Sequence, residues 1–288
     1  MTMEEHYHQV NGVTLHTVEA GDKSGDCILF LHGFPEFWYG WKKQISFFAE
    51  KGFRVIVPDQ RGYNLSSKPP GIKSYSLQHL TADIVALIQK LTNKKVILAG
   101  HDWGGAVAWQ IALRYPQLVH CLIIINMPHP VVFRQTLKKS IRQILHSSYA
   151  GFFQLPLLPE WVCRAFDFKL LRRSMQKTTR KGVFTKEDMA TYKKAWQQPG
   201  ALTAMINWYR AFRYNKHAGP GVVNLPVLLI WGKKDQFLLS RMAKQSISKC
   251  TDGNLVMVED ATHWVHHEKP DLVNTLIHDF ITGRHAGR

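Results

Sequence analysis

The sequence predicts an α/β fold in which a mostly parallel sheet is interrupted by a long helical insertion. Short apolar runs alternate with segments of helical apolar spacing over residues 27–125, which is the pattern of parallel strands joined by helices. The same alternation resumes near the C-terminus. Between the two stretches, residues 131–221 have a helical pattern and no convincing strand. We therefore expect an α/β core formed by residues 1–130 and 222–288, with residues 131–221 inserted as a helical cap.

The elements before the insertion follow a regular order. Asn11-Gly12 lies between two short strand-like segments, and this dipeptide is a strong signal for a β-hairpin. Strands are then expected over residues 27–31, 53–57, 96–99 and 119–125, and helices over residues 41–51, 77–91 and 104–114. The strands are short, continuous apolar runs, which is typical of buried strands.

The insertion differs from the core in composition. It is rich in Lys, Arg and aromatic residues and is interrupted at Pro156, Pro159 and Pro199. After it, the core is completed by strands over residues 227–231 and 255–258 and helices over residues 241–248 and 270–281. With 288 residues, 45% of them hydrophobic, the chain is long enough for a large core with an inserted subdomain.

Several compositional features indicate a protein without a membrane anchor. No apolar run reaches the roughly 18 residues that a membrane-spanning helix needs, and residues 1–9 lack the basic and apolar segments of a signal peptide. The four cysteines are scattered without a CxxC pair; they are Cys27, Cys121, Cys163 and Cys250. Free thiols in a reducing compartment therefore fit better than disulfides or a zinc site, and we expect a cytoplasmic protein.

The net charge of +16 is concentrated in the insertion. Residues 131–220 hold 17 Lys and Arg against 4 acids, so 17 minus 4, or 13, of the 16 excess charges lie there. We interpret this mainly as a solvated basic face, which would also allow weak association with an anionic surface. Because no nucleic-acid-binding motif accompanies the charge, we do not expect a nucleic-acid partner.

The stretch from Leu98 to Ala108 has the form of a nucleophile elbow. A strand-like run is followed by a glycine-flanked bend at Asp102 and then by a helix with an apolar face. Gly100 and Gly104 would permit the strained backbone and the close packing of strand on helix that such a bend requires. The usual residue at the tip is Ser, so the carboxylate of Asp102 indicates a different nucleophile.

Two more candidate residues follow predicted strands at the edge where an open α/β sheet builds its site. Asp235 comes after the strand at residues 227–231, and His263 comes after the last strand. The order Asp102, Asp235, His263 is the nucleophile, acid and histidine order of α/β-hydrolases. We interpret His266 and His267 as surface or packing residues, because they fall within the next turn.

Together these motifs are similar to those of the α/β-hydrolase superfamily, and within it to the branch of epoxide hydrolases and haloalkane dehalogenases. The resemblance is carried by His32-Gly33-Phe34-Pro35, Asp59-Gln60-Arg61-Gly62-Tyr63, Gly100-His101-Asp102-Trp103-Gly104-Gly105, Trp231-Gly232 with Asp235, and His263-Trp264 with Glu268 and Pro270. It implies an eight-stranded, mostly parallel sheet flanked by helices. It also implies that Asp102 is the nucleophile and that Asp235 and His263 form the charge-relay pair.

An aspartate nucleophile indicates displacement at a saturated carbon. A serine would leave an ether there, whereas a carboxylate leaves an ester, which water can hydrolyse to restore Asp102. His263, oriented by Asp235, would take a proton from this water. The backbone N–H groups of Phe34 and Trp103 would form the oxyanion hole. The leaving group must be strained or intrinsically good, which restricts it to an epoxide oxygen or a halide.

Two cap tyrosines favour the epoxide. Opening an epoxide produces an alkoxide that needs a proton donor, and the resemblance to epoxide hydrolases implies two cap tyrosines for this purpose. Tyr149 lies five residues before Gln154, and Tyr209 lies in an Asn-Trp-Tyr-Arg segment, as in that family. We expect an apolar substrate pocket, lined by Phe34, Trp103, Phe152, Phe153 and Trp264.

Two alternative reactions, dehalogenation of a haloalkane and of a haloacid, stay open, and so does a role as an inactive receptor or scaffold. A haloalkane or haloacid dehalogenase would use the same nucleophile, and Trp103 could donate its indole N–H to a halide. However, Phe34 stands where haloalkane dehalogenases often have an Asn donor, and Ser148-Tyr149 stands where fluoroacetate dehalogenases have a His-Trp pair. A catalytically inactive receptor or scaffold predicts a degraded triad, which is not seen. A serine esterase is excluded, because the tip of the elbow is Asp102 and not a serine.

We therefore predict an epoxide hydrolase that acts on a small, mostly apolar epoxide without a cofactor or metal. Water would be added to give a vicinal diol through an ester on Asp102. The sequence leaves the natural substrate, and the choice between monomer and homodimer, open.

Overall fold

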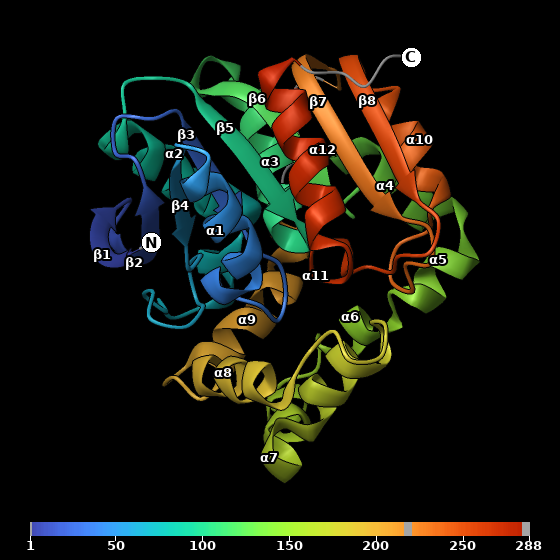
Figure 1. Ribbon diagram of the computed structural model, residues 1–288. Coiled ribbons are helices and arrows are strands. Elements are labelled where there is room, and N and C mark those ends of the chain that lie inside the picture. The colour runs from blue at the N-terminus through green and yellow to red at the C-terminus, as the bar shows by residue number, and fades with distance from the viewer. Residues whose placement is uncertain (1, 216–220, 284–288) are drawn as a thin grey trace.

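The computed structural model describes residues 2–215 and 221–283 and has one mixed sheet of eight strands in the order β1-β2-β4-β3-β5-β6-β7-β8. The strands are β1 (Met3–Val10), β2 (Val13–Gly21), β3 (Cys27–Leu31), β4 (Arg54–Pro58), β5 (Val96–His101), β6 (Val119–Ile125), β7 (Val223–Gly232) and β8 (Cys250–Val258). Strand β2 pairs antiparallel with β1 and β4, and every other pair is parallel. The predicted fold class is confirmed (Figure 1).

The N-terminal hairpin follows from its turn residues. Val10 pairs with Val13, so only Asn11 and Gly12 connect the strands. Both have positive φ, +47° and +74°, as a tight hairpin turn with the right-handed twist of the strands requires.

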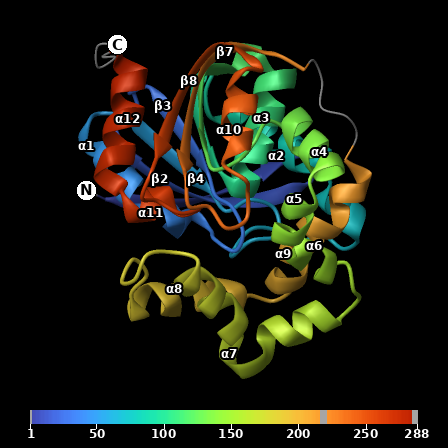
Figure 2. The same ribbon diagram turned by 90° about the vertical axis from the view of Figure 1, so that its right-hand side faces the viewer.

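Helices cover both faces of the sheet (Figure 2). The core helices are α1 (Lys42–Glu50), α2 (Leu77–Leu91), α3 (Asp102–Arg114), α10 (Arg241–Ile247), α11 (Val265–Glu268) and α12 (Pro270–Thr282). Side chains of β3 alternate between the faces, so Ile28 and Phe30 pack with α1 and α12, while Leu29 and Leu31 pack with α2, α3 and α10. This period of two explains why a strand buried on both sides is apolar at every position.

Short 3-10 helices complete the core. They are η1 (Trp38–Trp41), η2 (Ile72–Tyr75) and η3 (Pro116–Leu118). The first of them leads directly into α1, so the helix predicted over residues 41–51 is present with a different first turn.

In the described part of the segment between β6 and β7, the regular elements are all helices. It contains α4 (Pro130–Lys139), α5 (Ile141–His146), α6 (Ser148–Phe152), α7 (Leu158–Lys177), α8 (Lys186–Trp196), α9 (Ala201–Arg210) and η4 (Ala211–Tyr214). Helices α6 to α9 lie beyond the carboxyl ends of the parallel strands (Figures 1 and 2). We keep the name cap for residues 131–221; the division into core and cap domains stays a proposal, and residues 216–220 lie outside the described part.

Prolines mark the ends of the cap helices. Pro159 stands in the first turn of α7, where its missing N–H costs no helical hydrogen bond. Pro199 lies between α8 and α9, and Gly200, with φ of +75°, is the N-cap residue directly before α9. Helix α7 is also interrupted at residues 165–168, whose backbone is not helical.

Strands β7 and β8 begin earlier than predicted. We expected β7 from residue 227 and β8 from residue 255, but they start at Val223 and Cys250. The added residues include Pro226 and the polar run 251–254, which interrupt an apolar pattern. Strand β8 is the edge strand, so polar side chains there remain in water.

No described helix is long and apolar enough to cross a membrane. All four cysteines are free thiols, and three of them are buried.

Candidate active site

Asp102 lies at a sharp turn between strand β5 and helix α3. Its φ of +49° is in the left-handed region that residues with side chains seldom adopt. The turn is tightly packed, because a Cβ on Gly104 would lie 2.2 Å from the carbonyl oxygen of Leu31. A Cβ on Gly33 would lie 2.5 Å from the Cβ of Asp102. The strained turn thus presents the Asp102 carboxylate at the carboxyl end of the sheet and in the first turn of a helix, where the helix dipole favours an anion.

The three residues predicted as a triad meet in space. Nδ1 of His263 lies 2.8 Å from Oδ2 of Asp235, and Nε2 of the same ring lies 3.5 Å from Oδ2 of Asp102. The imidazole therefore stands between two carboxylates. Asp235 and His263 come from the loops after β7 and β8, so neighbouring parallel strands deliver both residues to the edge at which Asp102 lies.

The Asp235 carboxylate is fully engaged in hydrogen bonds. One oxygen accepts the backbone N–H groups of Phe237 at 2.7 Å and Leu238 at 3.0 Å. The other accepts from His263 and from the side-chain amide of Asn126, which is 2.6 Å away. Asn126 directly follows β6 and was not identified from the sequence. Its position at a strand end was the only available signal, because an Asn in a loop is otherwise ordinary.

The charges of this group stabilise one another. Burial disfavours the protonated form of His263, but the Asp235 and Asp102 carboxylates outweigh it and raise the pKa of His263 to about 10. Burial likewise disfavours the ionised form of Asp102, but His263 and the Phe34 N–H outweigh it and lower the pKa of Asp102 below its usual value. At neutral pH the site therefore holds an imidazolium between carboxylates.

The loop after β3 supplies a backbone donor to Asp102. The N–H of Phe34 donates a hydrogen bond to Oδ1 of Asp102 at 3.0 Å, and the Phe34–Pro35 peptide is cis. This donor already faces the carboxylate whose carbon would become tetrahedral when its ester is hydrolysed. The second predicted donor, the N–H of Trp103, lies in the first turn of α3, and its role stays a prediction.

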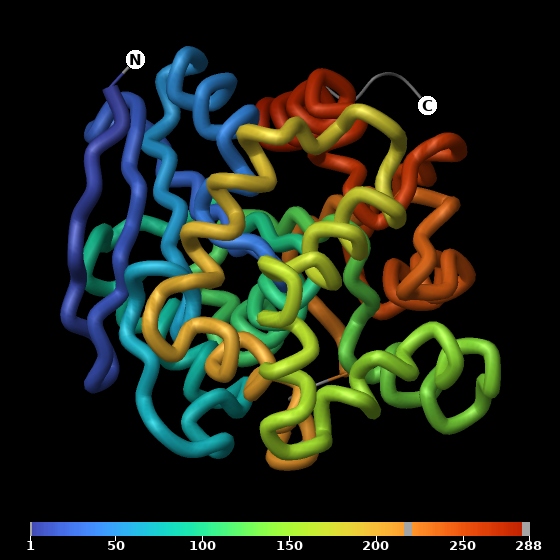
Figure 3. Tube along the Cα trace, turned by 90° about the horizontal axis from the view of Figure 1, so that it is seen from below, coloured from blue at the N-terminus to red at the C-terminus, as the bar shows by residue number. Residues whose placement is uncertain are grey.

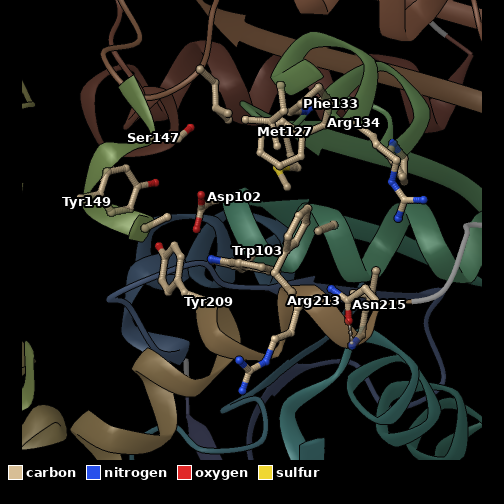
Figure 4. Close-up of a pocket in the computed structure, with 18 of the residues that line it drawn as sticks. Asp102, Trp103, Met127, Phe133, Arg134, Ser147, Tyr149, Tyr209, Arg213 and Asn215 are labelled. Carbon is tan, nitrogen blue, oxygen red and sulfur yellow. Dashed lines mark hydrogen bonds between the residues drawn. The ribbon is translucent and has the colours of Figure 1, made fainter. Parts of the chain in front are cut away.

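The two cap tyrosines face the nucleophile. Tyr149 comes from α6 and Tyr209 from α9, and Figure 4 shows both hydroxyl groups directed toward Asp102. Their rings are 5.7 Å apart between centroids, and Trp103 packs edge-on against Tyr209 at 5.2 Å. Burial, with a further effect of the Asp102 charge, raises the pKa of Tyr149 and of Tyr209. Both tyrosines therefore carry their protons at neutral pH.

A cavity of about 500 Å³ extends outward from these residues. Asp102, Trp103, Tyr149 and Tyr209 line one end. The remaining lining is mainly apolar and includes Met127, Phe133, Leu137, Ile144 and Phe212, with Arg134 and Arg213 also on the wall.

The cavity corrects the predicted pocket lining. Of the five side chains expected there, Trp103 lines it and four do not; these are Phe34, Phe152, Phe153 and Trp264. Two of the four, Phe34 and Phe153, pack against the ring of Tyr209 at 5.1 and 5.0 Å, while Trp264 packs edge-on against His263 at 5.3 Å. Phe34, Phe153 and Trp264 thus pack against the rings of the site residues and do not line the cavity.

A buried carboxylate behind the triad was also missed. Glu36 is 1% exposed, and its neighbours are the Tyr192 hydroxyl at 2.7 Å, His267 Nε2 at 2.6 Å, His101 Nδ1 at 3.2 Å and His266 Nε2 at 3.5 Å. Burial alone would raise the pKa of Glu36, but the histidines outweigh it and hold it well below its usual value. We expected His266 and His267 to be surface or packing residues. Both are buried, and they pack around the Glu36 carboxylate.

This cluster connects several parts of the site. The carbonyl of His263 accepts from Nε2 of His101 at 2.9 Å, so this nitrogen carries a hydrogen. Tyr192 belongs to α8, so Glu36 also joins the loop after β3 to the cap. Among the described residues, one possible metal-binding group was found, which consists of Glu36, His266 and His267. One potential ligand atom from each of them lies within 4.8 Å of the others. However, Glu36 and His267 already contact each other directly.

Comparisons with known proteins agree with this architecture. The family described as alpha/beta hydrolase fold matches residues 26–270. The AB hydrolase superfamily protein YfhM of Bacillus subtilis (strain 168) is 49% identical over 272 residues, which cover 94% of this chain and 95% of that protein. Epoxide hydrolase 2 of Caenorhabditis elegans is 38% identical over 281 residues, covering 95% of this chain and 78% of that protein.

A solved structure is also similar over nearly the full length. The Bacillus megaterium epoxide hydrolase in complex with an inhibitor superimposes with a TM-score of 0.88 and 32% identity, covering 96% of this chain and 100% of that one. The strained aspartate elbow, the order of the triad and these relatives all indicate the same family. The chain belongs to the α/β-hydrolase fold family and, within it, to the epoxide hydrolases.

Proposed function

We propose that this protein hydrolyses an epoxide to a vicinal diol through a covalent ester on Asp102. The observation that carries the proposal is the arrangement of Tyr149 and Tyr209, whose hydroxyl groups both face Asp102 at the end of a mainly apolar cavity. The epoxide oxygen would bind between these two donors. One epoxide carbon would then face the carboxylate, which is the geometry for displacement at that carbon.

The first step forms one bond and breaks another. An oxygen of Asp102 attacks the epoxide carbon, the ring C–O bond breaks, and the leaving oxygen takes a proton from Tyr149 or Tyr209. Such a positioned acid typically contributes about 10²- to 10⁴-fold to the rate. The tyrosines suit this role because their raised pKa keeps them protonated until an alkoxide, a much stronger base, develops beside them.

Formation of the ester also changes the charge around His263. Esterified Asp102 has no negative charge, so one of the interactions that raise the pKa of His263 disappears. The imidazolium then releases its proton, which restores the tyrosine that protonated the epoxide oxygen. A single proton thus moves from His263 to the product, and the neutral imidazole is left beside the ester.

The second step regenerates the enzyme. Neutral His263 takes a proton from water, and the hydroxide adds to the carbonyl carbon of the Asp102 ester. The N–H of Phe34, which is 3.0 Å from Oδ1 in the resting enzyme, would stabilise the developing oxyanion by about 3 kcal/mol. The intermediate then expels the second diol oxygen, which takes up the hydroxyl proton, and Asp102 and the His263 imidazolium are restored. We propose Asp235 as the residue that orients the ring.

We further propose a small, mainly apolar epoxide as the substrate, since apolar side chains dominate the cavity lining. We also propose a cytoplasmic location, because free cysteines are typical of a reducing compartment. The aryl and alkyl epoxides that fit a cavity of about 500 Å³ are suitable first substrates.

A dehalogenase is the second candidate, favoured by the Trp103 indole on the cavity wall. A side-by-side assay of styrene oxide, a bromoalkane and fluoroacetate separates the reactions. We expect diol from styrene oxide and no halide release from the other two. Halide release without diol formation would replace the proposal with dehalogenation, and no turnover of any substrate by correctly folded protein would favour an inactive fold member.

A further inference from the structure

The cap exposes an unusual concentration of large apolar side chains, which we call the cap patch. Of the fifteen exposed large hydrophobic residues in the described part of the chain, nine lie between residues 141 and 170. They are Ile141, Ile144, Leu145, Leu155, Leu157, Leu158, Trp161, Phe166 and Leu170. Such a concentration of exposed apolar side chains in one segment of the chain indicates an interaction surface, because a monomer ordinarily exposes only scattered single ones.

Several side chains of the cap patch are almost fully in solvent. The exposed fractions are 77% for Ile141, 80% for Leu157, 70% for Trp161 and 83% for Phe166. Burial of these side chains against a binding partner would therefore remove apolar surface from water and stabilise the complex.

The cap patch is nevertheless built on ordered structure. The Glu160 carboxylate, in the first turn of α7, binds the guanidinium of Arg210, with 2.9 Å between Oε2 and Nη2. At the last residue of the interruption of α7, Phe168 is buried and packs against Trp196 at 6.0 Å between ring centroids. Phe166, two residues earlier, has a positive φ of 50° and is exposed. Packing inside the cap therefore fixes the backbone that presents the exposed side chains.

Figure 3 views the molecule from below, and the backbone of α7 lies on its near side. Ile144 belongs both to the patch and to the lining of the active-site cavity. The patch therefore shares one residue with the cavity wall.

Basic side chains are interleaved with the apolar ones. Residues 131–177 hold nine Lys and Arg against two acids, Glu160 and Asp167. Both acids are already paired, Glu160 with Arg210 and Asp167 with Lys193. The exposed basic residues are Lys138, Lys139, Arg142, Arg164, Lys169, Arg173 and Lys177. Like charge opposes the docking of a second copy of this face and attracts a negatively charged surface.

We propose that the cap patch docks on a bilayer that contains anionic lipid. The large apolar side chains would enter the interface between head groups and acyl chains, and the lysines and arginines would lie at the lipid phosphates. This combination of Leu, Trp and Phe with Lys and Arg is what interfacial segments use. The protein would lie on the membrane without spanning it. On the proposed function, apolar epoxides dissolved in the lipid would then reach the cavity next to Ile144.

The test measures partitioning of the full chain onto vesicles. The protein is sedimented with phosphatidylglycerol vesicles and with phosphatidylcholine vesicles at low salt. We expect binding to the anionic vesicles only, weakened by added salt because the charges are screened. Brominated phosphatidylglycerol should quench part of the tryptophan fluorescence, through Trp161.

Two double variants address the two halves of the surface. Leu157→Ser with Trp161→Ser removes apolar contacts, and Lys139→Gln with Arg142→Gln removes charge. We expect each to weaken partitioning about tenfold or more. Matched controls outside the patch should bind like the wild type. These are Leu272→Ser, at 41% exposed on α12, and Lys94→Gln with Lys95→Gln.

Other outcomes overturn the proposal. Folded wild-type protein that stays in solution with anionic vesicles at low salt contradicts it. So does binding that the Leu157→Ser, Trp161→Ser protein retains in full, or binding without quenching. If these two substitutions instead convert a dimer into a monomer and no vesicle binding occurs, a second copy covers the patch. Melting curves and hydrolysis of a soluble epoxide verify that each variant is folded, since neither Leu157 nor Trp161 lines the cavity.

Discussion

Nε2 of His263 lies 3.5 Å from Oδ2 of Asp102, on the side of the ring opposite its 2.8 Å contact with Asp235. The same nitrogen thus faces the carboxylate that would attack the substrate and, after attack, the ester that water must reach. We therefore propose a different role for His263 in each of the two steps. On the proposed mechanism, His263 would be a counter-ion during ring opening and would become a base only when Asp102 has lost its charge.

Replacement of the histidine should therefore separate the two steps. In His263→Gln the nucleophile remains and the base is absent, so an alkyl-enzyme should accumulate and turnover should fall by about 10³-fold or more. Intact-protein mass spectrometry after epoxide addition should show one added substrate mass. The exposed His120 provides the control variant, His120→Gln, which should turn over normally. An His263→Gln protein that never gains mass would count against the assignment.

The tyrosines should affect ring opening rather than ester hydrolysis. In the His263→Gln background, Tyr149→Phe or Tyr209→Phe should slow accumulation of the alkyl-enzyme by about 10-fold to 100-fold, and the pair should slow it further. The rate is followed by quenched-flow mass spectrometry. Tyr7→Phe, at a residue 58% exposed on β1, is the matched control. If both single variants alkylate at the parental rate, the proton donor lies elsewhere.

The charged state of His263 predicts a dependence of stability on pH. Its pKa is raised from 6.5 to about 10 in the folded protein, so the folded state binds the proton more tightly than the unfolded state. This contribution to stability is complete below about pH 6.5 and is lost as the pH rises through about 10. Melting temperatures of wild type and His263→Gln should therefore converge across that interval.

An independent measurement tests the cause of this shift. In Asp102→Asn, one of the two carboxylates beside His263 is gone, so the pKa of His263 should be lower than in the wild type. Nitrogen-15 NMR of the imidazole resonances follows this directly. An unchanged titration in Asp102→Asn would mean that Asp102 does not control the charge of His263.

Glu36 should be important for stability. Its carboxylate is buried among three histidines and Tyr192, and removal of one partner from a buried charged group typically costs about 3 kcal/mol. Glu36→Gln should lower the free energy of unfolding by an amount of this order in urea titrations near neutral pH. Because the pKa of Glu36 is held well below its usual value, the difference from wild type should shrink as acid protonates the wild-type carboxylate.

The control for this prediction is Glu4→Gln, at an exposed ion pair with Lys23. Its urea midpoint should match that of the wild type, because exposed pairs contribute little. A Glu36→Gln protein with the wild-type midpoint would show that the buried cluster does not depend on the carboxylate charge.

The fold was largely predictable because the central strands carry their own signal. The apolar runs predicted over residues 27–31 and 119–125 coincide with β3 and β6, since a strand buried on both faces is apolar at each position. The start of β7 could not be found in this way. Pro226 interrupts the apolar pattern, and the pairing that includes it with β8 is visible only in the tertiary structure.

The same distinction applies to the site. Asp102, Asp235 and His263 were predictable because each follows a strand and their order is informative. Asn126 and Glu36 were not, because the importance of each depends on partners more than 100 residues away in the chain, such as Asp235 and Tyr192. The prediction of the pocket lining was wrong for a related reason. An aromatic residue that is close to a site residue in the sequence can face either the cavity or the rings that line it.

A single turnover in water enriched in oxygen-18 tests the ester on Asp102 most directly. With enzyme in excess over epoxide, the diol should carry the original carboxylate oxygen and no label, while the label enters Asp102. The tryptic peptide of residues 96–114, which contains Asp102, should become heavier by one exchange of oxygen-16 for oxygen-18. Labelled diol from the first turnover, with an unlabelled peptide, would show that water attacks the epoxide directly and would contradict the covalent mechanism.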